Sequence, residues 1–195
     1  MLLSLAPTIN SRNQLGKLLA DSDIPISVAA EVGTHRGDFA KTLLDSAWGG
    51  FLHCIDPWSN PPDYVEQAKF LWGNGDREED YQYAMKLLEP HKDRVRFHRV
   101  LSAEAAGFFE DGSLGFVHLD GNHEPPYVEQ DLELWWPKLQ RGGILAGHDF
   151  ICPNEINGGW GRYIQPAVMK FFRSWTIQLI VEPNSCPWTY YVVKL

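Results

Sequence analysis

Short apolar runs alternate along the chain with stretches in which leucine and aromatic residues recur at helical spacing. A short, continuous apolar run is typical of a strand that is buried on both faces of a parallel sheet. Such runs lie at 26–30, 51–55, 95–100, 115–119, 144–147, 176–181 and 188–193. Helical spacing predicts helices at 10–21, 39–46, 78–88, 126–136 and 166–174. This alternating order predicts an α/β fold whose mostly parallel sheet is covered by helices on both faces.

The last two apolar runs are expected to pair differently from the others. A short connection containing Pro and Asn separates 176–181 from 188–193, which favours an antiparallel hairpin. No internal repeat, low-complexity tract or linker interrupts the chain, and 195 residues suffice for one good-sized core. We therefore expect a single domain over residues 1–195.

Composition narrows the classes of partner. The net charge is −8, the pI is about 5.3 and there is no basic run, so nucleic acid and anionic membrane surfaces are poor partners. No apolar run approaches a membrane span, and the N-terminal Met-Leu-Leu-Ser-Leu-Ala is too short for a signal sequence. Cys54, Cys152 and Cys186 lack a Cys-x-x-Cys pair, which favours a reducing compartment. We expect a cytoplasmic protein, and its many aromatic residues are compatible with a homodimer.

The stretch 27–39 joins a predicted strand to a predicted helix through a glycine-containing turn. In that geometry, backbone N–H groups and a helix N-terminus face a ligand at the end of the sheet. The spacing is Glu-x-Gly-x-x-x-Gly, so the dinucleotide fingerprint Gly-x-Gly-x-x-Gly is not met. An acid at Glu31, before the first glycine, would repel a pyrophosphate and would suit a sulfonium or ammonium group. The alternative is an ordinary strand-to-helix turn with polar caps.

The second predicted strand also ends in an acid, within Asp56-Pro57-Trp58. In nucleotide-binding α/β folds, a carboxylate about 20 residues beyond the glycine turn binds the ribose hydroxyls. Trp58 is suited to pack on an adenine face. The alternative is a turn or N-cap aspartate, which Asp-Pro also favours. Further polar residues follow the later strands, namely Ser102, Asp120, His148 and Asp149.

With these motifs, nearly the whole chain resembles the class I S-adenosylmethionine-dependent methyltransferases. The segments that carry the resemblance are 31–37, Asp56, 102–106, 118–123, 127–137 and 142–150. The last of them resembles a small bacterial subfamily that includes macrolide sugar O-methyltransferases, and cephalosporin-hydroxylase-like proteins share the pattern. The resemblance implies a Rossmann-like, doubly wound, seven-stranded, mostly parallel sheet with an antiparallel last strand.

The resemblance also implies roles for individual residues. The implied cofactor-binding residues are Glu31, Gly33, Thr34, His35, Gly37, Asp38, Asp56, Pro57, Trp58, Ser102, Ala103 and Asp120. The implied metal ligands are Asp120, His148 and Asp149, with magnesium or manganese as the ion. His148 stands where this family usually has a carboxylate, which disfavours magnesium and suits manganese, iron or zinc. A site without metal stays open.

Methyl transfer from a sulfonium to a hydroxyl needs a deprotonated nucleophile that is held in line. Orientation contributes about 7 kcal/mol or more, and a base or metal must lower the barrier of the weakly acidic hydroxyl. The resemblance makes His123 the general base and Asp149 its catalytic partner, and imidazole titrates in the right range. The alternative is a turn histidine packed against Trp135 or Pro125.

We therefore predict an S-adenosylmethionine-dependent methyltransferase that acts on a hydroxyl of a small-molecule acceptor. Segments 58–76 and 152–163 are expected to form a substrate lid. The alternative is a protein that binds S-adenosylmethionine or S-adenosylhomocysteine without transfer and serves as a partner subunit or sensor. A nucleotide-dependent oxidoreductase is disfavoured, because Gly-x-Gly-x-x-Gly and Tyr-x-x-x-Lys are both missing.

Overall fold

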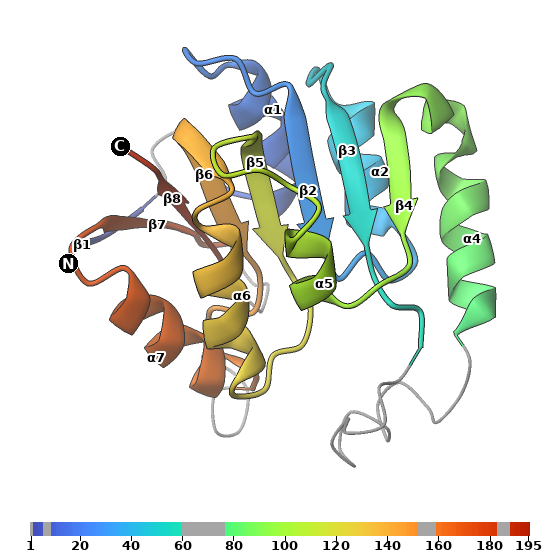
Figure 1. Ribbon diagram of the computed structural model, residues 1–195. Coiled ribbons are helices and arrows are strands. Elements are labelled where there is room, and N and C mark those ends of the chain that lie inside the picture. The colour runs from blue at the N-terminus through green and yellow to red at the C-terminus, as the bar shows by residue number, and fades with distance from the viewer. Residues whose placement is uncertain (1, 6–8, 60–76, 152–158, 183–187) are drawn as a thin grey trace.

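An eight-stranded sheet runs through the structure, a computed structural model that describes residues 2–5, 9–59, 77–151, 159–182 and 188–195 (Figure 1). The strands are β1 (Leu2–Leu5), β2 (Val28–Val32), β3 (Phe51–Ile55), β4 (Val95–His98), β5 (Leu114–Leu119), β6 (Leu139–Gly147), β7 (Thr176–Ile180) and β8 (Thr189–Val193). Their order across the sheet is β1-β7-β8-β6-β5-β2-β3-β4. The chain order therefore reverses between β2 and β5, which is where open α/β sheets bind ligands.

The strands β2 to β8 form the predicted seven-stranded, mostly parallel sheet with an antiparallel last strand. β2 pairs in parallel with both β3 and β5, whereas β8 runs antiparallel to both β6 and β7. The fold class and the closing hairpin are confirmed. The sequence did not predict β1, which adds an eighth strand in parallel to the edge strand β7.

Helices cover both faces of the sheet (Figure 1). They are α1 (Leu15–Ala20), α2 (Asp38–Asp45), α4 (Glu78–Leu88), α5 (Ser102–Ala106), α6 (Tyr127–Trp135) and α7 (Gly161–Phe171), with 3₁₀ turns η1 (Arg12–Gln14) and η2 (Glu89–Arg94). α1, α2 and α4 pack on one another over one face, and α5, α6 and α7 do so over the other. Among the described residues, no helix has both the length and the apolar character to cross a bilayer.

Two helix boundaries differ from the prediction. α7 begins at Gly161, before the predicted start at Pro166, which lies inside the helix. The apolar face of α7 explains the difference, because Ile164 and Ala167 are both buried against the sheet. Ser102 was expected to cap a helix, but it is the first residue of α5, and its hydroxyl bonds elsewhere.

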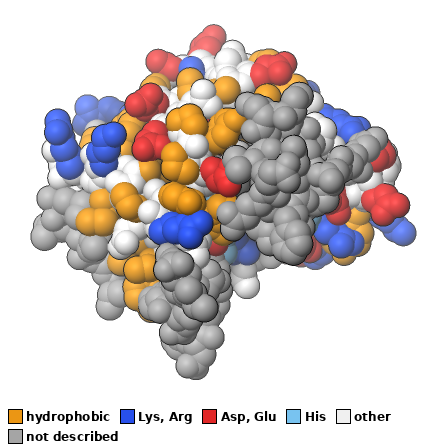
Figure 2. Space-filling view, turned by 90° about the horizontal axis from the view of Figure 1, so that it is seen from below, with side chains coloured by type: hydrophobic (Ala, Val, Ile, Leu, Met, Phe, Trp, Pro, Cys, Tyr) orange, Lys and Arg blue, Asp and Glu red, His pale blue; other side chains and the backbone are white. Residues whose placement is uncertain are grey.

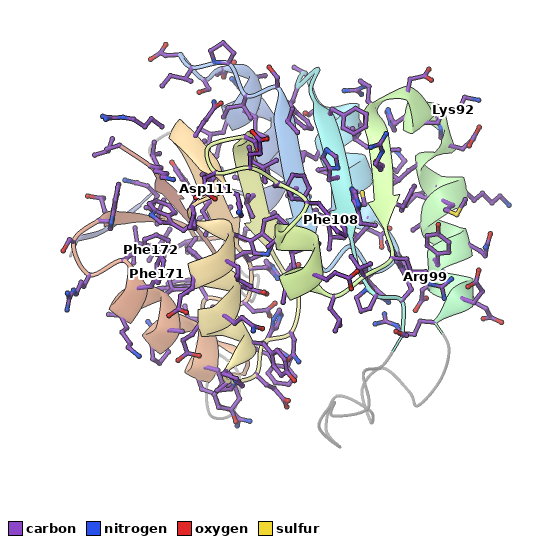
Figure 3. The ribbon with its side chains drawn as sticks, viewed as in Figure 1. Lys92, Arg99, Phe108, Asp111, Phe171 and Phe172 are labelled. Atoms are coloured by element: carbon purple, nitrogen blue, oxygen red, sulfur yellow. The ribbon has the colours of Figure 1, made fainter. Side chains whose placement is uncertain are left out.

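Aromatic packing fixes α7 against the end of α6. The Trp136 ring lies 4.8 Å from that of Phe172 and 6.4 Å from that of Phe171, centroid to centroid. Phe171 and Phe172 lie at the end of α7 (Figure 3). Aromatic pairs of this kind contribute about 0.5–1.5 kcal/mol each beyond their burial. The helices that flank the site described next are therefore firmly placed.

Candidate functional site

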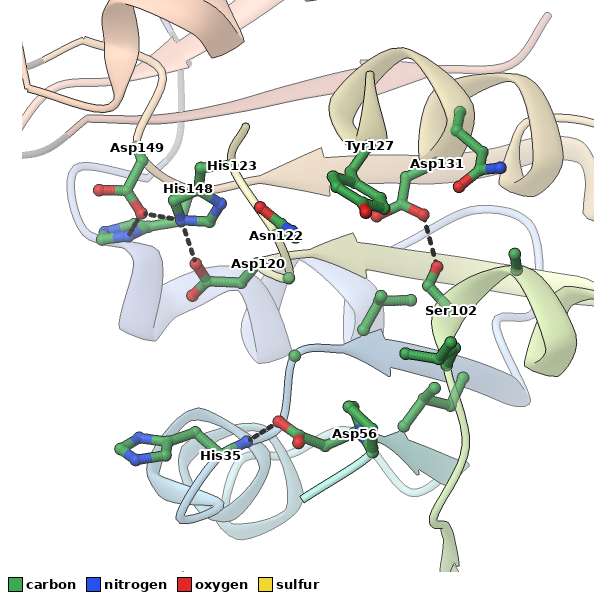
Figure 4. A pocket seen from close by; sticks show the side chains of 18 of the residues that line it. His35, Asp56, Ser102, Asp120, Asn122, His123, Tyr127, Asp131, His148 and Asp149 are labelled. Atoms are coloured by element: carbon green, nitrogen blue, oxygen red, sulfur yellow. Dashed lines mark hydrogen bonds and ion pairs between the residues drawn. The ribbon is translucent and has the colours of Figure 1, made fainter. Parts of the chain in front are cut away.

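A cavity of about 460 Å³ opens at the carboxyl ends of the central strands (Figure 4). Its wall includes the last residue of β2 and of β3, the loop 120–123 after β5, and His148 and Asp149 after β6. The same end of the molecule is seen from outside in Figure 2, where acidic, basic and hydrophobic side chains are interspersed on the visible surface. Most of the polar residues that the sequence placed at strand ends thus face one cavity.

The first glycine after β2 is needed for the close approach of two loops. Gly33 has a φ of +89°, and a Cβ there would lie 2.0 Å from the carbonyl oxygen of Asp120. Its N–H donates to the carbonyl of Ile55 at 2.8 Å. Gly33 therefore joins the ends of β2, β3 and β5 and leaves its own backbone on the cavity wall.

Asp56 lies on the cavity wall with its carboxylate held in place by backbone donors. Oδ2 accepts a hydrogen bond from the N–H of His35 at 2.9 Å, and Oδ1 accepts one from the N–H of Trp58 at 2.8 Å. Each carboxylate oxygen keeps a further lone pair for a ligand hydroxyl. Asp56 is 6% exposed, so this ligand would be bound with little competing water. The arrangement suits the two adjacent hydroxyls of a ribose.

The structure corrects the expectation that Trp58 stacks on adenine. Trp58 is fully buried and is not part of the cavity wall. Its Nε1 donates to the carbonyl of His35 at 2.7 Å, and its ring packs 4.8 Å from that of Tyr81. The indole thus supports the loop behind Asp56. Its neighbour Pro57 does line the cavity, as do His35 and Ala103.

Three further residues of the glycine stretch lie away from the cavity wall. Thr34 is buried, and its N–H donates to the carbonyl of Ile55 at 3.3 Å. The N–H of Gly37 donates to the carbonyl of Thr34 at 2.8 Å, so both backbone donors are already used. Asp38 is exposed in the first turn of α2. The expected ligand contacts of these three residues are therefore not provided by this conformation.

Glu31 is also absent from the cavity wall, because its side chain points to the opposite face of the sheet. It is 2% exposed and lies in register with Cys54 on β3 and His118 on β5. His118 packs 4.2 Å from the ring of Phe39 on α2. Burial raises the pKa of Glu31 to about 8, and the nearby Asp120 acts in the same direction. The expected contact between Glu31 and the cofactor is thus corrected.

Opposite Asp56, a cluster of histidines and aspartates closes the cavity (Figure 4). His123 Nε2 lies 2.9 Å from Asp149 Oδ2 and 3.5 Å from Asp120 Oδ1. The structure therefore brings together the expected base and its expected partner. Arg12 of η1 donates to the other oxygen of Asp120 at 3.2 Å, a contact that the sequence did not predict.

The two carboxylates decide the charge of His123. Burial acts to lower the pKa of His123, but the hydrogen bonds with Asp120 and Asp149 outweigh it and raise the pKa to about 9. Burial acts to raise the pKa of Asp149, but hydrogen bonds from His123 and His148 hold it below its usual range. At neutral pH this site therefore holds an imidazolium between two carboxylates.

The described residues contain one cluster whose donor atoms are close enough to share a metal ion. These are Asp120, His123 and Asp149, with ligand atoms all within 4.8 Å of one another. His148, which was expected in this set, instead has its Nδ1 3.0 Å from Asp149 Oδ2. The metal expectation is corrected at that position, since His148 orients a ligand of the cluster.

Sequence reasoning missed Asp131, which lines the same cavity from α6. Its Oδ1 accepts a hydrogen bond from the Ser102 hydroxyl at 2.5 Å, and that hydroxyl oxygen accepts one from Trp135 Nε1 at 2.9 Å. The signal in the sequence was an acid on the apolar face of a predicted helix, one position before Leu132. A charged residue there is rarely buried without a specific partner.

Of the expected lid, only 58–59, 77 and 159–163 fall among the described residues or next to them; 60–76 and 152–158 lie outside. Within the described part, Trp160 lines the cavity, with its ring 5.8 Å from that of His123. The expected aromatic wall is present at this position. Whether the segments close over a ligand stays a prediction.

Fold and site together define a protein that binds a nucleotide-like cofactor at the switch point of an open α/β sheet. Residues 30–150, more than half of the chain, match a family described as "Methyltransferase domain". The chain therefore belongs to this family, the class I S-adenosylmethionine-dependent methyltransferases.

Three similar proteins agree with this assignment. An uncharacterised protein of Sinorhizobium fredii, y4gI, is 29% identical over 147 residues, which are 72% of this chain and only 15% of that protein. A Staphylococcus aureus structure assigned as a caffeoyl-CoA O-methyltransferase has a TM-score of 0.63 at 14% identity, covering 97% of this chain and 86% of its own.

The third is a Burkholderia thailandensis 1,6-didemethyltoxoflavin-N1-methyltransferase with bound 1,6-didemethyltoxoflavin and S-adenosylhomocysteine. It has a TM-score of 0.59 at 14% identity, covering 95% of this chain and 79% of its own. At such identities the two structures show a shared fold. The acceptor of this chain is a separate matter.

Proposed function

We propose that the chain transfers the methyl group of S-adenosylmethionine to a hydroxyl group of a small molecule. One observation carries the proposal: His123 and Asp149 form a hydrogen-bonded pair at one end of a cavity whose other end carries Asp56. The acceptor oxygen attacks the methyl carbon, and the carbon–sulfur bond breaks to leave S-adenosylhomocysteine. The hydroxyl proton passes to His123.

The cavity has the size and lining for the cofactor. Its volume of about 460 Å³ falls within the range of small-molecule sites. Asp56 would bind the ribose hydroxyls, and the apolar side chains of Ile55 and Leu101 would flank the adenine. The bare backbone at Gly33 leaves room for the methionine portion between the two ends of the site.

His123 is placed to act as a base through the nitrogen that Asp149 does not occupy. Asp149 accepts the Nε2 proton and so fixes the tautomer, which leaves Nδ1 to take the proton of the acceptor hydroxyl. A bound sulfonium is a cation, and it opposes the imidazolium form of a nearby ring. Cofactor binding would therefore favour the neutral imidazole that the reaction requires.

The same cluster is the candidate site for a divalent cation. Asp120, His123 and Asp149 supply two carboxylates and one imidazole, a mixed donor set that fits manganese, iron or zinc better than magnesium. A cation there would lower the pKa of a hydroxyl bound to it. His123 would then be a ligand through Nε2, so the base and ligand roles can be separated by experiment.

Calorimetric titration with S-adenosylmethionine and S-adenosylhomocysteine, with and without magnesium or manganese, tests the proposal. We expect micromolar binding of both compounds in the absence of metal. Heat that appears only with manganese, and that is lost in Asp120→Asn, would support the cation site. Failure of both compounds to bind under all conditions would overturn the cofactor assignment.

A second assay separates transfer from binding alone. S-adenosylhomocysteine formation is followed across a panel of small hydroxyl compounds, with a matched panel of amines. Methylation confined to the hydroxyl panel supports the proposal. Methylation confined to the amines would refute the hydroxyl acceptor, and tight binding without any product would favour a partner subunit or sensor.

A further inference from the structure

Three side chains form a hydrogen-bond relay that ends at the cavity wall. Trp135 Nε1 donates to Ser102 Oγ at 2.9 Å, and Ser102 Oγ donates to Asp131 Oδ1 at 2.5 Å (Figure 4 draws the second bond). An indole nitrogen can only donate, so the Ser102 oxygen must accept from it and its proton must point to Asp131. The direction of the relay is therefore fixed, and Asp131 Oδ1 is an acceptor.

The other oxygen of Asp131 faces the cavity. Asp131 is 6% exposed and is part of the cavity wall, and its Oδ2 lies beside Gly121. Within the part of the chain that the structure describes, Asp131 forms one hydrogen bond, the bond from Ser102. A buried carboxylate that faces a binding cavity with one oxygen unused is matched by a ligand that donates a hydrogen bond.

The surroundings of Asp131 indicate which donor this is. Ile55 and Leu101 give the neighbouring wall an apolar character suited to a flat ring, and Asp56 provides a place for the attached ribose. The adenine ring carries one hydrogen-bond donor, its exocyclic amine. We infer that Asp131 accepts a hydrogen bond from the N6 amine of the cofactor's adenine and makes the site selective against 6-oxopurines. This inference rests on the proposed binding of S-adenosylmethionine.

A purely structural role does not account for this arrangement. Trp135 is fully buried and its N–H needs one acceptor, which Ser102 supplies without any carboxylate. Burial raises the pKa of Asp131 to about 6, although the bond from Ser102 acts in the other direction. The carboxylate is therefore maintained against a desolvation cost, as expected for a residue that contacts a ligand.

The test compares S-adenosylhomocysteine with S-inosylhomocysteine, in which the 6-amine is replaced by a carbonyl oxygen. We expect the wild-type protein to bind the adenosyl compound about tenfold or more tightly than the inosyl compound. Asp131→Asn keeps an oxygen for Ser102 and offers an amide N–H₂ to the 6-carbonyl. It should weaken binding of the adenosyl compound, tighten binding of the inosyl compound, and so abolish or reverse the preference.

Glu133→Gln is the matched control, because Glu133 is exposed on the same helix. It should leave both affinities unchanged, and thermal unfolding should show that both variants fold. Equal weakening of the two ligands by Asp131→Asn, or an unchanged preference, would overturn the inference and leave the proposed function intact. If wild type binds the inosyl but not the adenosyl compound, the inference is overturned as well. Absence of binding by either compound would overturn both.

Discussion

The backbone N–H of His35 donates a 2.9 Å hydrogen bond to Asp56 Oδ2 and so ties the glycine loop after β2 to the acid after β3. His35 adopts a φ of +50° there, an uncommon conformation for a residue with a side chain. The tie holds the loop and the carboxylate in one arrangement before any ligand arrives. Such preorganisation reduces the ordering cost of binding.

Replacing Asp56 by alanine is therefore expected to weaken cofactor binding strongly. Asp56→Ala removes the ribose acceptor and leaves the N–H groups of His35 and Trp58 without their partner. We expect a loss of about 1.5–3 kcal/mol, which is at least tenfold in the dissociation constant of S-adenosylhomocysteine. Calorimetry measures it, with Asp38→Ala, exposed on α2, as the control. Equal affinities in wild type and Asp56→Ala would refute the ribose assignment.

Asp149→Asn should separate binding from chemistry. The amide cannot hold the imidazolium of His123 as the carboxylate does, so the base loses its orientation and its charge partner. We expect the turnover rate to fall by about 10²–10⁴-fold, while the affinity for S-adenosylhomocysteine changes little. Steady-state kinetics with the hydroxyl compound found by the panel assay gives the rate, and calorimetry gives the affinity. A variant that loses both equally would show that Asp149 serves cofactor binding instead.

Gly33→Ala is expected to destabilise the protein and abolish cofactor binding. A Cβ at this position would lie 2.0 Å from the Asp120 carbonyl oxygen, at a φ of +89° that disfavours side chains. Gly112 offers a matched control, because its φ is +74° and a Cβ there meets nothing within 4 Å. Gly112→Ala should cost about 1 kcal/mol in urea unfolding, from strain alone, and should leave binding intact. Comparable losses in the two variants would contradict the role of close approach at Gly33.

The strands that carry the site were predictable because their signal is local. Buried parallel strands are continuous apolar runs, and the glycine turn and Asp56 follow them at a spacing set by the chain itself. β1 was missed because its pairing with β7 joins residues at opposite ends of the sequence. Trp58 was misjudged because its burial depends on Tyr81 and Phe97, which come from other elements.

The side of the sheet on which a residue lies was the hardest property to predict. Asp131 belongs to the site only because α6 packs beside α5 and brings it to Ser102. Glu31 leaves the site because side chains alternate along β2, which turns its carboxyl towards the face that α1 and α2 cover. Neither fact follows from spacing within a single motif.

Buried Glu31 predicts a dependence of stability on pH. Its pKa in the folded protein is raised to about 8 from an ordinary value of 4.5. Between these values the folded protein keeps a proton that the unfolded chain has lost, so the free energy of unfolding falls as pH rises. The contribution of Glu31 has a slope of at most about 1.4 kcal/mol per pH unit and levels off above pH 8.

Glu31→Gln keeps the uncharged shape of the side chain between Cys54 and His118 and should remove this slope. Urea unfolding from pH 5 to pH 8.5 measures it. The variant should gain stability relative to wild type as pH rises, by a few kcal/mol at most at the alkaline end. Glu79→Gln, on the exposed side of α4, should follow the wild-type curve. A constant difference between Glu31→Gln and wild type across this range would mean that Glu31 is already ionised in the fold. Its carboxylate would then need a partner on the buried face, and Arg12, which already bonds Asp120, is the nearest cation that acts on its pKa.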